Sequence, residues 1–277
     1  MAEITSEIEN YKSLAKEVRR DILDMIYRTK SPHIGSSFSM VELLVVLYFR
    51  ILSLDPGKPS DKNRDRFLLS KGHGCPALFA ILAKKGFLTK EDLDGFALNG
   101  DYLGQHPNRD VGKGIEITSG SLGHGLSQGS GMALAGKYDK ANYRVFAFLG
   151  DGELNEGSVW EAALFASHHK LDNLVVIIDR NRLQALGSGS EIMNLEPLAE
   201  KWASFGWAVK EIDGHNFEEI IPALESVKSR NVADTPSVVI AKTIKGKGVS
   251  FFEGLAKYHG VAPTDEEFKK ALKELGV

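Results

Sequence analysis

Apolar residues along this chain fall into short runs separated by longer stretches with helical spacing. Each run has the length of a buried strand and is followed by glycine or polar residues, so it predicts a β-strand. The five runs are 67–70, 145–149, 174–178, 207–212 and 237–241. Strands that alternate with helices are typical of a parallel sheet covered by helices on both faces. We therefore predict an α/β fold with a doubly wound, mostly parallel sheet, in a single domain that spans residues 1–277.

Capping patterns predict where several helices begin. In a capping box, a small polar residue and an acid three positions later each bond the other residue's backbone N–H. We expect boxes at Ser6 and Glu9, at Ser39 and Glu42, and at Thr264 and Glu267.

The predicted helix 126–138 is unusual because it contains Gly129, Gly131 and Gly136. Each glycine inside a helix costs about 1 kcal/mol relative to alanine. We therefore expect another backbone or a ligand to approach this helix closely.

The stretch 143–186 predicts a strand, a turn, a helix and a second strand, which together form one βαβ unit. Such a unit brings both strand ends to the edge of the sheet where α/β proteins bind ligands. Asp151 follows the first strand and Asn181 follows the second, about thirty residues later. Carboxylate and amide oxygens suit Mg²⁺, and Gly150 and Gly152 allow close approach to a ligand.

Asp151 could instead simply cap a tight turn between strand and helix. The asparagine at the next strand end makes us favour a metal–diphosphate site. The dinucleotide-binding pattern fits less well because Asn155 replaces its third glycine, and the chain has no Walker-type loop.

Four histidines lie in loops of small residues rather than in periodic segments: His33, His73, His106 and His259. Any one of them alone is more simply explained as a loop histidine bonded to backbone. Four in this setting favour a functional role, because imidazole donates to phosphate or sugar oxygens and transfers protons near neutral pH. A transition-metal site is a poorer interpretation, since no pair has the His-x-x-x-His spacing. We expect His215 to be a turn residue.

Composition excludes several classes of protein. The net charge of −3, from 34 basic and 37 acidic residues, gives no electrostatic support for a nucleic-acid partner. No apolar stretch is long enough to span a membrane. The single cysteine, Cys75, excludes an internal disulfide and suits a reducing compartment, so we expect a cytoplasmic protein.

The segment Gly-Asp-Gly-Glu-Leu-Asn-Glu-Gly at 150–157, followed by Asn181, resembles the thiamin-diphosphate signature of the transketolase family. Other segments resemble transketolase motifs in the same order along nearly the whole chain. They are 31–33, 69–73, 104–107, 119–123, 213–215, 242–246 and 259–260. The chain departs from the family at His124, where transketolases commonly have glutamine.

The resemblance implies thiamin diphosphate and a divalent cation, Mg²⁺ or else Ca²⁺ or Mn²⁺, as cofactors. It implies that Asp151, Asn181 and the Leu183 carbonyl hold the cation. The residues implied to contact the diphosphate or its surroundings are His73, Gly152, Asn181, Lys245 and His259. Those implied to line the thiamin ring are Gly120, Ser121 and Leu122, with Ser36 as a further candidate.

The resemblance also implies catalytic roles. His33, His73 and His106 would face the substrate hydroxyls and assist proton transfer, and His259 would also contact substrate. Glu156 would link paired active sites across a dimer.

Transketolases are more than twice as long as this chain, and the absent part supplies the glutamate that activates the cofactor. We therefore expect a split transketolase, in which a separate subunit brings the pyrimidine-binding and C-terminal domains in an α₂β₂ assembly. The pair would transfer a two-carbon ketol unit between sugar phosphates. The alternatives are the α subunit of a 2-oxoacid dehydrogenase, a sugar-specialised ketolase, and a non-catalytic module that retains the fold.

Overall fold

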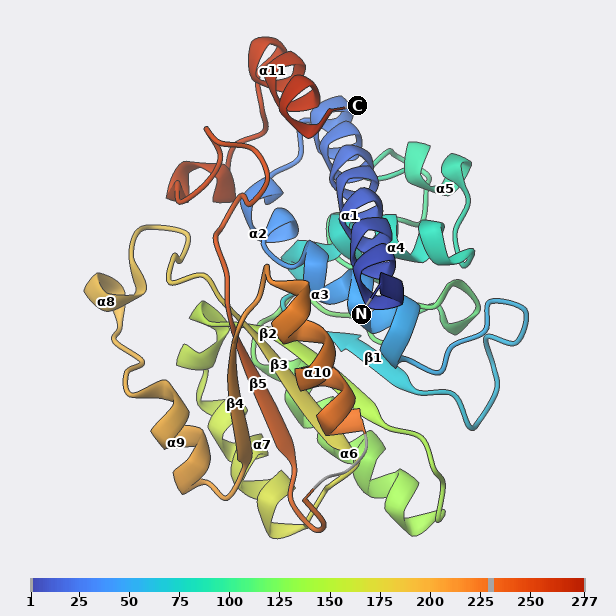
Figure 1. Ribbon diagram of the computed structural model, residues 1–277, viewed down its shortest axis with the longest axis vertical. Coiled ribbons are helices and arrows are strands. Elements are labelled where there is room, and N and C mark those ends of the chain that lie inside the picture. The colour runs from blue at the N-terminus through green and yellow to red at the C-terminus, as the bar shows by residue number, and fades with distance from the viewer. Residues whose placement is uncertain (1, 229–231, 277) are drawn as a thin grey trace.

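A computed structural model describes residues 2–228 and 232–276 and shows a five-stranded parallel sheet at the centre of the protein (Figure 1). The strands are β1 (Arg66–Leu69), β2 (Val145–Gly150), β3 (Leu174–Arg180), β4 (Ala208–Asp213) and β5 (Ser237–Lys242). Their order across the sheet is β1-β2-β3-β5-β4, and every neighbouring pair is parallel. The predicted fold class and all five predicted strands are confirmed.

Helices cover both faces of this sheet (Figure 1). They are α1 (Ala2–Thr29), α2 (Ile34–Phe38), α3 (Val41–Val46), α4 (Cys75–Lys85), α5 (Lys90–Asp94), α6 (His124–Tyr138), α7 (Gly157–His168), α8 (Gly189–Ile192), α9 (Leu198–Ser204), α10 (Phe217–Lys228) and α11 (Asp265–Leu275). Successive strand residues point to opposite faces. In β2, Phe146 and Phe148 accordingly pack with α1, α3, α4 and α10, whereas Val145 and Ala147 pack with α6, α7 and α9.

Two of the three predicted capping boxes are wrong. Helix α1 begins at Ala2, so Ser6 and Glu9 lie inside it. Ser39 caps no helix, because its hydroxyl donates a hydrogen bond of 2.6 Å to the buried carboxylate of Asp179. The box at Thr264, which begins α11, is confirmed.

The glycines of α6 meet close neighbours at some positions only. A Cβ on Gly125 would lie 2.4 Å from the Cβ of Ser70, and a Cβ on Gly136 would lie 2.8 Å from the ring of Tyr143. A Cβ on Gly131 would meet nothing within 4 Å. Another backbone therefore approaches the helix closely at Gly125, where the Cα of Ser70 would lie 2.8 Å away. At the three glycines named in the prediction no backbone does so, because Gly136 meets a side chain, Gly129 has only ordinary side-chain contacts at 3.5 Å or more, and Gly131 meets nothing.

Among the described residues, no helix is both long and apolar enough to cross a membrane.

Candidate cofactor and active site

The carboxyl ends of β2 and β3 bring the predicted metal ligands together. Gly150 pairs with Asp179 in the sheet register, and the backbone N–H of Asp151 donates to the Asp179 carbonyl at 3.2 Å. One carboxylate oxygen of Asp151 accepts from the N–H of Arg182 at 2.5 Å. Asp151 and Asn181 are therefore neighbours in space, as the βαβ interpretation requires.

The oxygens at this edge have the chemistry of a site for a hard divalent cation. Asp151 offers a carboxylate, Asn181 an amide oxygen that accepts from the N–H of Leu183 at 3.0 Å, and Leu183 a backbone carbonyl. Burial and the nearby charge of Asp179 raise the pKa of Asp151 to about 6. A cation would offset that unfavourable buried charge. Within the described part of the chain, no three His, Cys, Asp or Glu side chains cluster as a metal site, so any site here relies on amide and carbonyl oxygens.

Three of the four loop histidines form a tight cluster, and the fourth lies at its rim. The rings of His33 and His73 are 5.2 Å apart, those of His33 and His259 are 5.1 Å apart, and those of His73 and His259 are 5.2 Å apart. His106 is exposed, with its ring 6.2 Å from that of His33. His33 has a left-handed backbone (φ 78°), and its N–H donates to the His259 carbonyl at 2.9 Å. This bond ties two loops that are distant in sequence.

Burial keeps the clustered imidazoles neutral. Burial, followed by the charges of neighbouring groups such as His106 and Lys245, lowers the pKa of His33 to about 4. Burial and the charge of Lys71 lower the pKa of His73 to about 2, and burial and Lys245 lower that of His259 to about 4. At neutral pH each ring therefore offers one N–H donor and one nitrogen acceptor.

Lys245 connects the histidines to the edge of the sheet that carries Asp151, Asn181 and Leu183, which we call the metal edge. Its side chain is 2% exposed, and burial together with the charge of Lys71 lowers its pKa to about 8. The ammonium donates to the Leu183 carbonyl at 3.1 Å and lies 3.1 Å from Nδ1 of His259. A buried ammonium beside imidazole donors and an edge suited to a cation is an arrangement that suits a diphosphate.

The residues predicted to line the thiamin ring differ in exposure and in orientation. Gly120 lies beside His106, since a Cβ on it would be 3.2 Å from that ring. Of the next two residues, Ser121 is exposed and Leu122 half-buried. The Ser36 hydroxyl is turned away toward its own helix, where it donates to the His33 carbonyl at 3.1 Å.

Two further residues lie near the start of α6 and α7. Glu156 is exposed directly before α7, and its Cβ would lie 2.7 Å from a Cβ on Gly123. His124 is exposed at the first position of α6.

A cavity of about 530 Å³ opens beside the metal edge, lined by Asp151, Arg180, Arg182, Leu183 and part of the segment 188–196.

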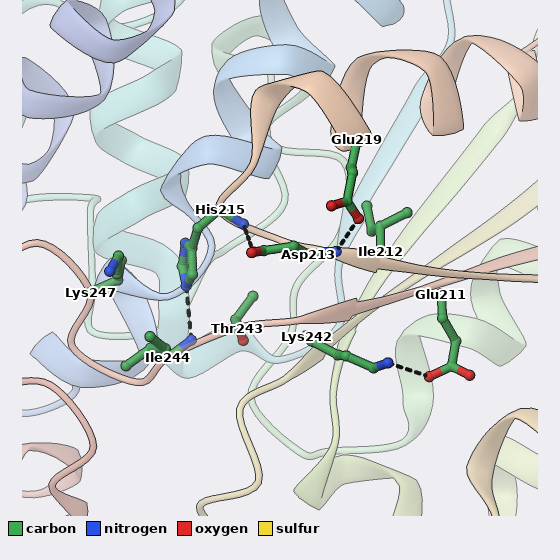
Figure 2. Close-up of a pocket in the computed structure, with 9 residues that line it drawn as sticks. All are labelled: Glu211, Ile212, Asp213, His215, Glu219, Lys242, Thr243, Ile244 and Lys247. Atoms are coloured by element: carbon green, nitrogen blue, oxygen red, sulfur yellow. Dashed lines mark hydrogen bonds and ion pairs between the residues drawn. The ribbon is translucent and has the colours of Figure 1, made fainter.

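A second cavity, of about 490 Å³, lies at the ends of β4 and β5, and its polar side chains bond to neighbouring backbone N–H groups or to other side chains (Figure 2). Lys242 pairs with Glu211 at 3.3 Å. Nε2 of His215 accepts from the N–H of Ile244 at 2.8 Å, and its Nδ1 lies 3.0 Å from the buried carboxylate of Glu42. His215 therefore joins three segments and is more than a turn residue.

Sequence reasoning missed the polar groups beneath the site. Lys71, Glu153 and Asp179 are each at most 2% exposed and bond to loops that carry candidate residues. All three lie in or beside the motifs that resemble the transketolase family, but nothing in the sequence shows that their charges are buried.

The parallel sheet, the metal edge at its strand ends and the adjoining histidine cluster together place this chain in a class of cofactor-binding domains. Residues 10–277 match the domain family described as the thiamine diphosphate binding domain of transketolase. The chain belongs to the transketolase family. The resemblance seen in the sequence motifs and the predicted thiamin-diphosphate-binding fold are therefore confirmed.

Relatives of similar length are named as transketolase subunits. An apulose-4-phosphate transketolase subunit of Phocaeicola vulgatus is 44% identical over 269 residues, which are 97% of this chain and 95% of that one. A 6-deoxy-6-sulfo-D-fructose transketolase subunit of a Clostridium species is 44% identical over 94% of both chains. The prediction of a transketolase subunit of this length is thus confirmed.

Solved structures of longer transketolases share the fold. The transketolase of Campylobacter jejuni superposes with a TM-score of 0.89 at 32% identity over 96% of this chain and 42% of its own. That of Leishmania mexicana gives 0.88 at 30% identity over 96% and 41%. The chain thus spans about two fifths of the length of these enzymes.

Proposed function

We propose that this chain is a single cofactor-binding domain that forms the diphosphate-binding subunit of a two-subunit transketolase. The observation that carries the proposal is the convergence of His33, His73, His259 and Lys245 beside the edge formed by Asp151, Asn181 and Leu183. In this proposal the edge holds a divalent cation such as Mg²⁺, and Lys245 with His73 contacts the diphosphate of thiamin diphosphate. Gly152 leaves room for the cofactor, and Gly120, Ser121 and Leu122 line its ring.

When bound, thiamin diphosphate supplies the carbon nucleophile that carries a two-carbon ketol unit between sugars. The protein residues bind and orient the sugar. Because the ammonium of Lys245 can only donate, Nδ1 of His259 is the acceptor. The proton of the neutral His259 ring therefore lies on Nε2. His259 then presents an N–H donor, and His33 and His106 bind hydroxyl groups and transfer protons. Glu156, which is exposed, is the candidate link to a second site.

The remaining components are assigned to a partner. We propose a separate C-terminal subunit, with pyrimidine-binding and C-terminal domains, that completes an α₂β₂ enzyme in the cytoplasm. Support comes from the relatives named as subunits and from longer transketolases of which this chain matches about two fifths.

A sugar-specialised ketolase is the second candidate for the activity. Two relatives that are 44% identical to this chain carry the names of the less common sugars apulose 4-phosphate and 6-deoxy-6-sulfofructose. The substrates are therefore proposed at the level of ketose and aldose phosphates or similar anionic sugars.

The test is a ketol-transfer assay from xylulose 5-phosphate to ribose 5-phosphate with thiamin diphosphate and Mg²⁺. The purified chain is compared with tagged chain recovered from its host together with any companion. We expect activity only in the second sample, with one stoichiometric companion. A companion without this activity would point to another sugar, whereas the absence of both activity and companion would favour a non-catalytic module.

A further inference from the structure

Glu153 lies in the turn after β2 and is 2% exposed. One carboxylate oxygen accepts from the hydroxyl of Ser70 and from the N–H of Gly123, the latter at 2.9 Å. The other oxygen accepts from the N–H of Gly150 at 3.1 Å. The Ser70 hydroxyl in turn accepts from the N–H of Gly125 at 3.1 Å, which extends the network into α6. One buried carboxylate thus joins the end of β1, the end of β2 and the start of α6.

Each of these three partners adjoins a segment with a proposed cofactor role. Ser70 leads into the loop that carries His73. Gly123 directly follows residues 120–122, which are proposed to line the thiamin ring. Gly150 directly precedes Asp151 of the metal edge. The Ser70 hydroxyl takes part in the same network, since it donates to Glu153 and accepts from the N–H of Gly125.

The carboxylate is well suited to fix the relative positions of these loops. Hydrogen bonds to an ionised acceptor are stronger than bonds between neutral groups, and a buried carboxylate is costly unless its oxygens are bonded. Gly123 is the N-cap of α6 and has no side chain to cap that helix, so Glu153 also supplies negative charge at the helix N-terminus. A shift of any one loop would break a bond of the buried charge.

We propose that Glu153 is a positioning residue that sets the affinity of the site for thiamin diphosphate by holding these three loops in register. The inference rests on the proposed function because it concerns the same cofactor. It adds a role for a residue that touches neither cofactor nor substrate in that proposal.

A control exists at the opposite, amino-terminal ends of the strands. Asp65 is also 2% exposed, and its carboxylate accepts from the N–H of Ser53 at 2.9 Å and from the N–H of Arg144 at 2.8 Å. It therefore also joins loops before β1 and β2, with the Arg144 guanidinium as a further donor at 3.0 Å, and none of these loops carries a candidate cofactor residue. If the Kd changed only because the protein was destabilised, substitutions at Glu153 and at Asp65 would both raise it.

The variants are Glu153→Gln, Ser70→Ala and Asp65→Asn, each prepared with the companion subunit. Glutamine keeps the volume but places an NH₂ group against an N–H, so at least one of three bonds is lost. Titration calorimetry gives the Kd for thiamin diphosphate with Mg²⁺, and thermal unfolding gives Tm. Hydrogen exchange reports the opening of the segments 70–73, 120–123 and 150–152.

We expect Glu153→Gln to raise the Kd at least tenfold and to increase exchange in all three segments, with a smaller effect from Ser70→Ala. We expect Asp65→Asn to lower Tm by a similar amount while changing the Kd less than twofold. An unchanged Kd in Glu153→Gln, or a Kd that follows Tm equally in Asp65→Asn, would overturn the inference alone. A wild-type complex that binds no thiamin diphosphate would overturn the proposed function as well.

Discussion

The ammonium of Lys71 and the carboxylate of Asp179 form an ion pair beneath the candidate site, with side chains only 1% and 0% exposed. Lys71 lies two residues before His73, and Asp179 lies two residues before Asn181, so the pair links the histidine cluster to the metal edge. The Lys71 ammonium also donates to the Ser36 carbonyl at 2.9 Å, and Asp179 accepts from Ser39 and Thr243. Burial by itself would raise the pKa of Asp179. The charge and hydrogen bond of Lys71 outweigh that effect, so the pKa is lowered and the carboxylate stays ionised.

We expect Lys71→Met to reduce the free energy of unfolding by about 3–5 kcal/mol, because it leaves a buried carboxylate uncompensated. The double variant Lys71→Met/Asp179→Leu should lose less than the sum of the two single changes. Urea unfolding of all three variants measures the coupling. The exposed pair of Lys170 and Asp234 is the control, and Lys170→Met should change stability by less than about 1 kcal/mol. Equal effects in the buried and exposed pairs would contradict the prediction.

Two glycines of α6 should respond to alanine in opposite directions. Gly125→Ala would place a Cβ 2.4 Å from the Cβ of Ser70, so we expect a loss of stability of about 1–3 kcal/mol from overpacking. Gly131→Ala meets open space and should stabilise the chain by about 0.5–1 kcal/mol through helix propensity. Thermal unfolding of the purified chain measures both. Destabilisation by Gly131→Ala would show that this position has a constraint beyond its visible neighbours.

Sequence patterns predicted the strands well because the runs are short, are rich in Val and Ile or Phe, and end in glycine or polar residues, which together distinguish a buried strand from a buried helix segment. The pairing of Asp151 with Asn181 followed from topology alone, since parallel strands bring their ends to one edge. The association of the four histidines did not follow from spacing, because it depends on loops that meet only in three dimensions. It was available only through the resemblance to a family.

Burial explains why the role of Ser39 was wrongly predicted and that of Glu153 was missed. Ser39 has the spacing of a cap, but its hydroxyl is used by the buried carboxylate of Asp179. Glu153 reads as one more acid in a polar turn, yet its side chain bonds three separate segments. Local pattern shows which polar residues can form bonds, and only the packing shows which partners they meet.

If the metal edge binds the cation, the cofactor should stabilise the folded protein, and this stabilisation should depend on Asp151. A ligand at one hundred times its Kd stabilises the folded state by about 2.7 kcal/mol. We expect Mg²⁺ with thiamin diphosphate to raise the Tm of the wild-type complex, and EDTA to remove the increase. Asp151→Asn should show no such increase, because it loses a charged ligand. Asp139→Asn, an exposed carboxylate at the end of α6, should respond as the wild type does. An undiminished shift in Asp151→Asn would exclude this edge as the cation site.

The half-buried histidines of the cluster lead us to expect that stability falls as the pH is lowered below neutrality. The pKa of His73 is about 2 in the folded protein, against an ordinary value of 6.5, and those of His33 and His259 are about 4. As pH falls below 6.5, the unfolded chain takes up protons that the folded protein does not bind. The stabilising contribution is therefore complete above pH 6.5 and is lost as pH falls toward the folded pKa values.

For His73 the loss approaches about 1.4 kcal/mol per pH unit, and for the more exposed His33 and His259 it should be smaller. We expect urea unfolding between pH 7.5 and 5 to show this slope, and His73→Gln to flatten it by removing one titrating group. His168, which is exposed on α7, provides the control, so His168→Gln should leave the slope unchanged. A slope that is the same in wild type and His73→Gln would mean that His73 takes up its proton over the same pH range in the folded and the unfolded protein, so that burial does not hold this ring neutral.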